Sequence, residues 1–571
     1  MTQQQKGTAP VLSVRNLSVD ARTPTGLKRI LDGVSFTLNA GETLCLAGES
    51  GSGKSVTSLA TMGLLPKASL RVASGEIRLG ERNLLGLSER AMRRIRGGEI
   101  AMIFQEPMTS LNPVMTIGAQ LTEAIREHRD DLTQSPEIVA KQMLDAVHMT
   151  QAAHRLTQFP HELSGGMRQR VMIAMALSCQ PKVLIADEPT TALDVTVQAQ
   201  ILTLMRELRQ EFDTSILMIT HDMGVVAEMA DRVAIMQNGR IVEQGDVIDI
   251  FETPAEPYTR ELLAAVPHLG ALAGTDGPPR VTEAARLPAQ PQPILEVAEL
   301  SVTYGAKSGW LGRGTAPPPT VSNINFSLKA GETLGLVGES GSGKSTTGKA
   351  VLGLIPFDGS VRIAGREVFQ SSPSIMLPIR RAAQMIFQDP YASLDPRMNV
   401  GSAVAEPLVI HNIGNASERR DRVAALLKRV GLTPDAAGRY PHEFSGGQRQ
   451  RICIARALAL EPKLIVADES VAALDVSVRG RVLDLMLELQ EQMGLAYLFI
   501  SHDMAVIEKM AHHVAVMRGG QIVEMGTRRQ VFENPGNDYT QALMSAVPIP
   551  EPRRYRDSNR AEREIGMMRS S

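Results

Sequence analysis

Apolar and polar residues alternate along this 571-residue chain in two recurring kinds of segment. Short apolar runs, such as residues 183–186 and 216–219, are typical of strands buried on both faces of a parallel sheet. Between such runs lie longer stretches, such as residues 197–212, whose apolar side chains recur at the helical period. This alternation predicts an α/β fold.

The chain also repeats itself, because one ordered set of motifs occurs twice. The paired segments are residues 48–55 and 338–345, 164–170 and 445–451, 185–195 and 466–476, and 219–223 and 500–504. Four ordered matches indicate one domain used twice. A stretch rich in Pro, Ala and Gly separates the copies and is typical of a linker. We expect a first domain over 1–267, a linker over 268–293, a second domain over 294–548 and a polar tail over 549–571.

Composition narrows the possible functions. The formal net charge is −2, which gives no support to binding of a polyanion by the whole chain. Cys45, Cys179 and Cys453 form no CxxC pair, so we expect buried small side chains and neither a zinc site nor an iron–sulfur cluster. The N-terminus lacks a signal-peptide pattern, and no apolar run reaches the ~18–20 residues that span a bilayer. We expect a cytosolic chain unless a partner brings it to the membrane.

A glycine-rich G-x-x-x-x-G-K-S motif follows an apolar run in each copy and precedes a helix-compatible stretch. Backbone N–H groups of such a loop surround phosphates, the lysine neutralises them, and the serine binds Mg²⁺. A glycine-rich turn with a solvated lysine is the alternative, and two complete copies in this context weigh against it. The expected phosphate-binding residues are Gly48, Glu49, Ser50, Gly51, Ser52, Gly53, Lys54 and Ser55, with Gly338, Glu339, Ser340, Gly341, Ser342, Gly343, Lys344 and Ser345.

Two adjacent carboxylates end a buried strand in each copy: Asp187 with Glu188, and Asp468 with Glu469. The aspartate suits a direct or water-mediated ligand of Mg²⁺, and the glutamate suits orientation or deprotonation of the attacking water. A solvated, helix-capping acidic pair is the alternative.

Gln105 and Gln388 end apolar strands, where the amide could touch Mg²⁺ and the attacking water. His221 and His502 also follow apolar strands and could donate a hydrogen bond to the γ-phosphate. A single glutamine of this kind is more often a surface amide, and a single histidine is more often structural. Equivalent placement in both copies favours the functional interpretation.

A Ser-Gly-Gly turn opens a helical run in each copy, and the turn at a helix N-terminus can bind an anion. Each domain already has a loop for its own phosphates, so we expect the turn to contact the nucleotide of the opposite copy. A simple helix cap is the alternative. The residues are Ser164, Gly165 and Gly166, with Ser445, Gly446 and Gly447.

These motifs, in this order, resemble those of ATP-binding-cassette (ABC) ATPases. The resemblance implies two tandem P-loop NTPase domains, each with a RecA-like core and a helical signature subdomain, that hydrolyse ATP with Mg²⁺. It also implies head-to-tail closure: Ser164 and Gly166 would face the nucleotide on Lys344, and Ser445 and Gly447 would face the nucleotide on Lys54.

One position departs from the resemblance. The family stacks adenine on an aromatic side chain after the first strand, and the second copy offers Tyr304 there. The aligned residue of the first copy is Ala21, so stacking at that site must be weaker or come from another residue.

Several segments are similar to the ATPases of oligopeptide and dipeptide importers: Met102–Pro113, Met385–Pro396, Pro257–Pro267 and Asp538–Pro548. The fused arrangement is similar to that of the glutathione importers and related peptide importers. The resemblance implies two permease partners, an extracytoplasmic solute-binding protein and a peripheral place on the inner face of the cytoplasmic membrane. It implies neither a nucleic-acid partner nor a homodimer. Residues 108–111 and 391–394 are candidate permease-docking surfaces, with a proline-terminated turn as the alternative.

A tandem ABC ATPase of translation or DNA repair is the rival interpretation. Its linker would be long and charged, or its sequence would carry zinc cysteines or coiled coils, and the chain shows none of these. The peptide-importer segments also argue against an exporter ATPase. The cargo stays open among glutathione, dipeptides, longer peptides and a nickel complex.

Overall fold

A computed structural model describes residues 10–23, 26–105, 110–129, 132–191, 193–275, 293–304, 318–368, 373–472 and 474–556. The chain forms two compact units: Met1–Val266 together with Pro548–Ser571, and Pro267–Val547. Most of the expected linker, residues 276–292, and of the expected tail, residues 557–571, lies outside the described residues.

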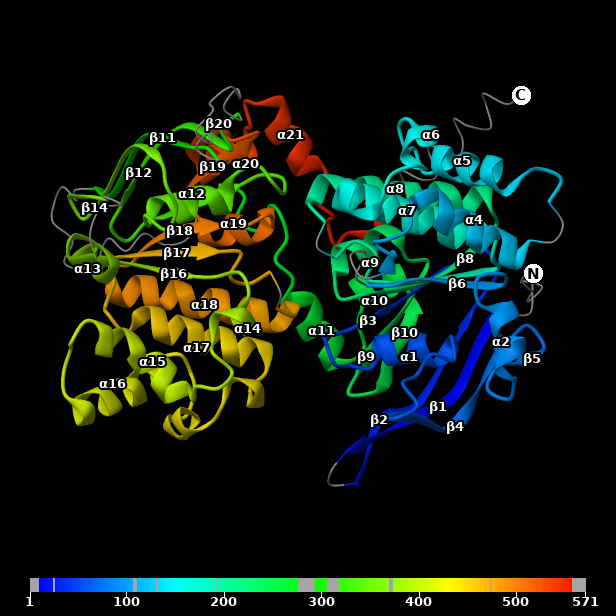
Figure 1. Ribbon diagram of the computed structural model, residues 1–571. Coiled ribbons are helices and arrows are strands. Elements are labelled where there is room, and N and C mark those ends of the chain that lie inside the picture. Colours follow the sequence, from blue (N-terminus) through cyan, green and yellow to red (C-terminus); the bar gives the residue numbers. More distant parts are fainter. Residues whose placement is uncertain are drawn as a thin grey trace. The chain divides into compact units, whose positions relative to one another are not determined.

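A six-stranded sheet forms the centre of the first unit (Figure 1). Its strands are parallel except for one edge strand, which pairs antiparallel with its neighbour. In sheet order they are β10 (Arg240–Asp246), β9 (Arg232–Gln237), β3 (Thr43–Ala47), β8 (Ser215–Thr220), β7 (Val183–Asp187) and β6 (Ile100–Ile103). Both β7 and β8 are buried along their full length, which confirms the strands predicted from the two apolar runs.

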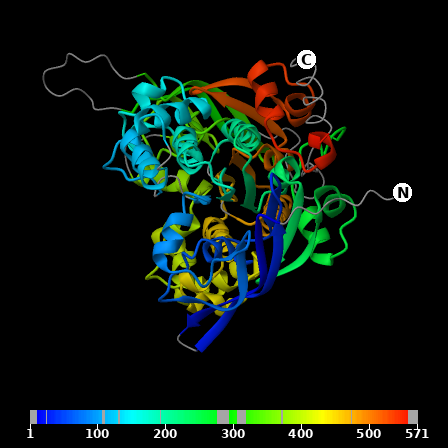
Figure 2. The same ribbon diagram turned by 90° about the vertical axis from the view of Figure 1, so that its right-hand side faces the viewer.

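A separate four-stranded antiparallel sheet covers one face of this centre. Its strands, in sheet order, are β2 (Gly26–Leu38), β1 (Leu12–Thr23), β4 (Leu70–Leu79) and β5 (Arg82–Asn83). The hairpin of β1 and β2 continues past the end of β4, whose last partner on β1 is Ala21 (Figure 2).

Helices complete the first unit. They are α1 (Lys54–Thr61), α2 (Glu89–Ile95), α4 (Ile117–His128), α5 (Pro136–Ala146), α6 (Ala152–Arg155), α7 (Gly165–Leu177), α8 (Val195–Glu211), α9 (Met223–Met229), α10 (Val247–Glu252) and α11 (Pro257–Ala264), with a 3₁₀ turn at Pro160–Glu162. The helix predicted over residues 197–212 is α8, confirmed with slightly earlier bounds.

Alternation along the central strands divides the apolar core of this unit in two. On β7, Leu184 and Ala186 pack with the helices α4, α5, α7 and α8. Val183 and Ile185 face the other way and pack with the antiparallel sheet. Strand β7 is thus buried on both faces, by helices on one side and by the antiparallel sheet on the other, as the apolar run predicted.

The second unit repeats this plan. Its central sheet, in order, is β16 (Ala383–Ile386), β17 (Leu464–Asp468), β18 (Ala496–Ile500), β13 (Thr333–Val337), β19 (His513–Arg518) and β20 (Gln521–Thr527). Its antiparallel sheet is β12 (Val321–Lys329), β11 (Pro293–Val302), β14 (Asp358–Ile363) and β15 (Arg366–Glu367). Strand β11 thus begins at Pro293, which the sequence analysis assigned to the linker.

The helices of the second unit also follow the order of the first. They are α12 (Lys344–Val351), α13 (Pro373–Ala382), α14 (Pro390–Ser393), α15 (Val400–Ile410), α16 (Ala416–Arg429), α17 (Gly446–Leu458), α18 (Val476–Met493), α19 (Met504–Met510), α20 (Arg528–Glu533) and α21 (Asp538–Ser545), with 3₁₀ turns at Pro434–Gly438 and Pro441–Glu443. Figure 1 shows α15, α16 and α17 on the opposite side of the central sheet from β11 and β12.

Each unit also binds a short segment that follows the last helix of the other unit in the sequence. In the second unit, the backbone N–H of Gly270 donates to Glu508 at 2.8 Å. In the first unit, Arg556 donates to Asp246 at 2.8 Å, from a helical turn over residues 552–556. None of the described helices is long and apolar enough to cross a membrane.

Candidate nucleotide-binding and catalytic site

The glycine-rich loops lie where the sequence places them, between a central strand and the following helix: β3 and α1, then β13 and α12. Gly53 has φ +106°, and a Cβ there would stand 2.5 Å from Leu31 Cδ2. Gly48 has φ +145°, and a Cβ there would stand 2.3 Å from the Met236 carbonyl oxygen. The loop conformation therefore depends on glycine at both positions.

The lysine of each loop lies buried at the loop's centre. Lys54 Nζ donates to the carbonyl oxygens of Gly48 at 2.7 Å and Glu49 at 2.8 Å. Lys344 Nζ makes the same two contacts, at 2.8 Å each, with Gly338 and Glu339. A buried ammonium group ringed by loop backbone at a helix N-terminus is suited to binding the charge of a phosphate.

The serine after each lysine faces the aspartate at the end of a neighbouring strand. Ser55 Oγ donates to Asp187 Oδ1 at 3.2 Å, and Ser345 Oγ donates to Asp468 Oδ1 at 2.8 Å. Burial raises the pKa of Asp187 to about 6, and burial also raises the pKa of Asp468. A nearby divalent cation would offset this cost of ionisation.

Mg²⁺ prefers hard oxygen ligands and is usually held by one or two protein groups together with phosphate oxygens. The hydroxyl and carboxylate pair in each unit fits that requirement. No cluster of three or more His, Cys, Asp or Glu side chains suited to a metal occurs among the described residues.

The structure brings the remaining predicted catalytic residues of the first unit together around Glu188. Its Oε2 accepts a hydrogen bond from Gln105 Nε2 at 2.8 Å, and its Oε1 lies 2.9 Å from His221 Nδ1. The backbone of Glu188 has φ +48°, a conformation that non-glycine residues rarely adopt and that is common at functional sites.

The second unit builds the same cluster. Glu469 has φ +45°, its Oε2 accepts from Gln388 Nε2 at 2.6 Å, and its Oε1 lies 3.3 Å from His502 Nδ1. The hydrogen bond from His502 lowers the pKa of Glu469 despite burial. Burial alone would raise the pKa of Glu188, but the hydrogen bond and the charge of His221 outweigh burial, so this pKa is lowered as well. Both glutamates are thus carboxylates at neutral pH, as a group that orients or deprotonates water must be.

The two Ser-Gly-Gly turns, residues 164–166 and 445–447, here called the signature turns, cap helices in their own units. Ser164 Oγ accepts from the backbone N–H of Met167 at the start of α7, and Ser445 Oγ accepts from that of Gln448 at the start of α17. Both serines are exposed. A Cβ on Gly166 would stand 2.5 Å from Val197 Cγ1, so this glycine is required by close packing. The capping role is established here, and contact with a nucleotide stays a prediction.

The two positions predicted to differ in adenine stacking differ in structure as well. Tyr304 follows β11 and is 50% exposed, so its ring is available to a base. Ala21 lies inside the β1–β2 hairpin, opposite Lys28 on one side and Leu70 on the other. No aromatic side chain occupies this place in the first unit.

Two kinds of contact were not predicted from the sequence. Tyr258 and Tyr539, in the segments similar to peptide-importer ATPases, each accept a hydrogen bond at 3.3 Å from a loop residue, Glu49 N–H and Glu339 N–H. The repeated Tyr-Thr pair in α11 and α21 was the available signal. Thr191 Oγ1 donates to Glu188 Oε2 at 3.0 Å, and the repeat has Ala472 at this place.

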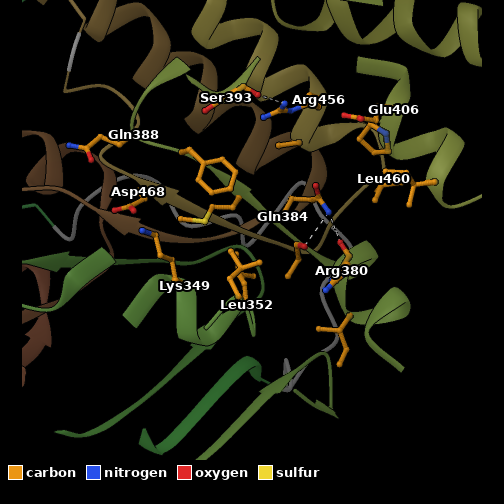
Figure 3. A pocket seen from close by; sticks show the side chains of 18 of the residues that line it. Lys349, Leu352, Arg380, Gln384, Gln388, Ser393, Glu406, Arg456, Leu460 and Asp468 are labelled. Carbon is orange, nitrogen blue, oxygen red and sulfur yellow. Dashed lines mark hydrogen bonds between the residues drawn. The ribbon is translucent and has the colours of Figure 1, made fainter. Parts of the chain in front are cut away.

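A groove of about 680 Å³ opens in the second unit beside Gln388 and Asp468 (Figure 3). Figure 3 shows Gln388 and Asp468 at one end and Glu406 and Leu460 at the other. Its wall includes three exposed apolar side chains, Leu354, Phe387 and Ile410. The predicted docking segment 391–394 contributes Ala392 and Ser393. Of its predicted counterpart, residues 108–111, the first two residues lie outside the described residues.

Comparisons with known proteins agree with this geometry. The ABC transporter family matches residues 31–191 and 321–472, and the C-terminal region of oligopeptide/dipeptide transporters matches residues 242–289 and 523–569. The chain is 54% identical to the glutathione import ATP-binding protein GsiA of Salmonella typhimurium (strain LT2) and 53% identical to that of Escherichia coli O157:H7. Each alignment covers 96% of this chain and 91% of the relative.

Among solved structures, cbiO1 of Clostridium perfringens, part of the ABC transporter complex cbiONQ, is similar at 27% identity. It covers 42% of this chain and 91% of its own, with a TM-score of 0.37. The two ABC matches coincide with the two units that carry the glycine-rich loops and the catalytic clusters. The chain belongs to the ATPases of ABC-type oligopeptide/dipeptide transporters, in a form that carries both ATP-hydrolysing cassettes.

Proposed function

We propose that this chain drives the import of glutathione or a similar short peptide, using Mg·ATP bound at two sites. The relatives with 53–54% identity are named as glutathione import ATP-binding proteins, and the matched C-terminal regions are those of peptide transporters. These regions favour an importer over a tandem ATPase of translation or repair. The duplicated cluster around Glu188 and Glu469 is the observation that carries the proposal.

Each residue of the cluster has a distinct role in this proposal. Lys54 and Lys344 hold the β- and γ-phosphates, and Glu188 and Glu469 orient or deprotonate the attacking water. The serine and aspartate hold Mg²⁺, which when bound neutralises charge on the transferred phosphate. His221 and His502, now beside the glutamates, donate toward the γ-phosphate. Gln105 and Gln388 link the cluster to the loops that follow β6 and β16.

The signature turns complete the two sites across the cassettes. Each turn presents an exposed serine at a helix N-terminus, and each cassette already has a loop for its own phosphates. We assign Ser164 and Gly166 to the nucleotide on Lys344, and Ser445 and Gly447 to the nucleotide on Lys54. Ser164→Arg then impairs hydrolysis at the Lys344 site. Loss confined to the Lys54 site would refute the assignment.

The partners are membrane permeases, two in number, with an extracytoplasmic solute-binding protein that selects the cargo. The chain then lies peripherally at the cytoplasmic face of the inner membrane. The groove beside Gln388 suits a permease segment with both apolar and charged side chains, because Phe387 and Ile410 share it with Arg380 and Glu406.

Co-purification tests the groove. Ile410 is 60% exposed and lines the groove, whereas its neighbour Val409 is 50% exposed and does not. Ile410→Asp should lose the permeases during purification of the complex, and the matched Val409→Asp should retain them. Equal retention by both variants would place the permeases on another surface.

Uptake tests the function as a whole. Cells lacking the chain should regain uptake of labelled glutathione when supplied with the natural chain, and should not regain it with the Glu188→Gln, Glu469→Gln variant. Uptake of a labelled dipeptide measured in parallel identifies the preferred cargo. Normal glutathione uptake in cells without the chain would contradict the proposal.

A further inference from the structure

The two cassettes differ at one position beside the catalytic glutamate, three residues further along the chain. In the first cassette this residue is Thr191, whose hydroxyl donates to Glu188 Oε2 at 3.0 Å. In the second cassette it is Ala472, which has no hydroxyl. The second cassette therefore serves as an internal reference for what the hydroxyl adds.

The backbone around the two positions is the same. Thr191 N–H donates to the Glu188 carbonyl oxygen at 3.2 Å, and Ala472 N–H donates to the Glu469 carbonyl oxygen at 3.1 Å. The glutamates have φ +48° and +45°. The turn that places residue 191 over the carboxylate thus forms without the hydroxyl, so the hydroxyl is not needed to build the turn.

The hydroxyl changes how the carboxylate is held. Oε2 of Glu188 accepts from two donors, Gln105 and Thr191, whereas among the described residues Oε2 of Glu469 accepts from Gln388 alone. The glutamine must release this oxygen if it is to reach Mg²⁺ or the attacking water. Glu188 then remains fixed by Thr191, and Glu469 does not have this second restraint.

The neighbouring Ser470 does not replace the missing hydroxyl. It stands where the first cassette has Pro189, and its side chain is 2% exposed. Its Oγ has no hydrogen-bond partner among the described residues, so it gives Glu469 Oε2 no second donor beside Gln388.

We propose that Thr191 is a positioning residue for Glu188, and that its absence from the second cassette makes the two sites hydrolyse ATP at unequal intrinsic rates. The inference rests on the proposed role of the glutamates. A catalytic group held in its productive geometry by a neighbouring hydrogen bond reacts faster. Loss of that bond lowers the rate of the chemical step without weakening ATP binding.

Single-turnover hydrolysis of prebound ATP tests the inference one site at a time. In a Glu469→Gln chain, only the first site is left to hydrolyse its ATP. Thr191→Val, which keeps the shape and removes the hydroxyl, should slow this step about fivefold, the scale of one hydrogen bond. Thr191→Ser, which keeps the hydroxyl, should restore the rate. The dissociation constant of ATP should stay within about twofold of its starting value in both variants.

The reciprocal experiment adds the hydroxyl to the second site. In a Glu188→Gln chain, Ala472→Ser should raise the single-turnover rate, and Ala472→Val should not. Unchanged rates in Thr191→Val, or failure of Thr191→Ser to restore a lowered rate, would overturn the inference. A different result would contradict the proposed function itself: continued ATP hydrolysis by the Glu188→Gln, Glu469→Gln chain.

Discussion

The hydroxyl of Tyr258 accepts a hydrogen bond at 3.3 Å from the backbone N–H of Glu49, across 209 residues of sequence. Tyr539 and Glu339 repeat this contact in the second cassette at the same distance. Each tyrosine lies within a matched oligopeptide/dipeptide C-terminal region, and each glutamate lies within a glycine-rich loop. The matched C-terminal region thus contacts the loop that we propose binds phosphate.

Tyr258→Phe and Tyr539→Phe should each weaken ATP binding at their own cassette. The change removes one acceptor from a loop N–H and keeps the ring, at a net cost of about 0.5–1.5 kcal/mol. Titration calorimetry with a slowly hydrolysed ATP analogue measures the change as a two- to tenfold rise in one of two dissociation constants, by the relation of ~1.4 kcal/mol per tenfold. Two unchanged constants would show that the contact does not support the loop.

Adenine stacking should differ between the cassettes. Tyr304→Ala should weaken ATP binding at the Lys344 site, because stacking of a base on an aromatic ring contributes about 1–3 kcal/mol. Ala21→Tyr should strengthen binding at the Lys54 site if the ring reaches past the β1–β2 hairpin. The same calorimetric titration measures the ATP affinity of both variants. Unchanged affinity in both would show that adenine stacks on other residues.

Mg²⁺ binding should depend on pH through Asp187. Burial raises the pKa of its carboxyl to about 6, so the carboxyl is protonated below that pH and ionised above it. A cation requires the ionised form, so Mg²⁺-dependent ATP binding should strengthen as the pH rises through about 6. Asp187→Asn should remove this component of the pH profile at the Lys54 site. A profile that Asp187→Asn leaves unaltered would show that another group titrates.

The second cassette buries an ion pair where the first has apolar residues. Arg528 is fully buried, and its Nη1 lies 3.3 Å from Glu508 Oε1. Arg528 is the first residue of α20, and Glu508 is the fifth residue of α19. In the first cassette, the first residue of α10 is Val247, and the fifth residue of α9 is Ala227. Arg528 also donates to the carbonyl oxygen of Thr275.

Breaking this pair should therefore destabilise the second cassette more than replacing it. Arg528→Val leaves the Glu508 carboxylate buried without its charge partner and should cost about 3–5 kcal/mol of unfolding free energy. The double variant Arg528→Val, Glu508→Ala copies the first cassette and should recover much of that loss. Denaturant unfolding measures both, and a double variant as unstable as the sum of its single variants would contradict the coupling.

Sequence patterns predicted the elements whose signal is local. Apolar runs predicted β7 and β8, helical spacing predicted α8, and glycine spacing predicted the loops that precede α1 and α12. Repetition then strengthened each single-residue assignment, such as His221 with His502. The comparison of the two copies within this one chain supplied that support, and no second protein sequence was needed.

Other features depend on the folded chain and could not be predicted. The contact of Tyr258 with Glu49 joins residues far apart in sequence, and the groove is formed by several elements of the second cassette. The hydroxyl of Thr191 donates to Glu188, whose backbone has a positive φ, and no pattern in the sequence specifies either feature.

The central claim is that Glu188 and Glu469 each activate water in a cassette that binds its own ATP. The most direct measurement compares ATP binding and hydrolysis by the natural chain and by the Glu188→Gln, Glu469→Gln chain. Both should bind two ATP molecules, and hydrolysis by the variant should fall by about 10²–10⁴-fold, the usual contribution of a general base. A stoichiometry of one, or hydrolysis by the variant within about tenfold of the natural chain, well short of that contribution, would contradict the account.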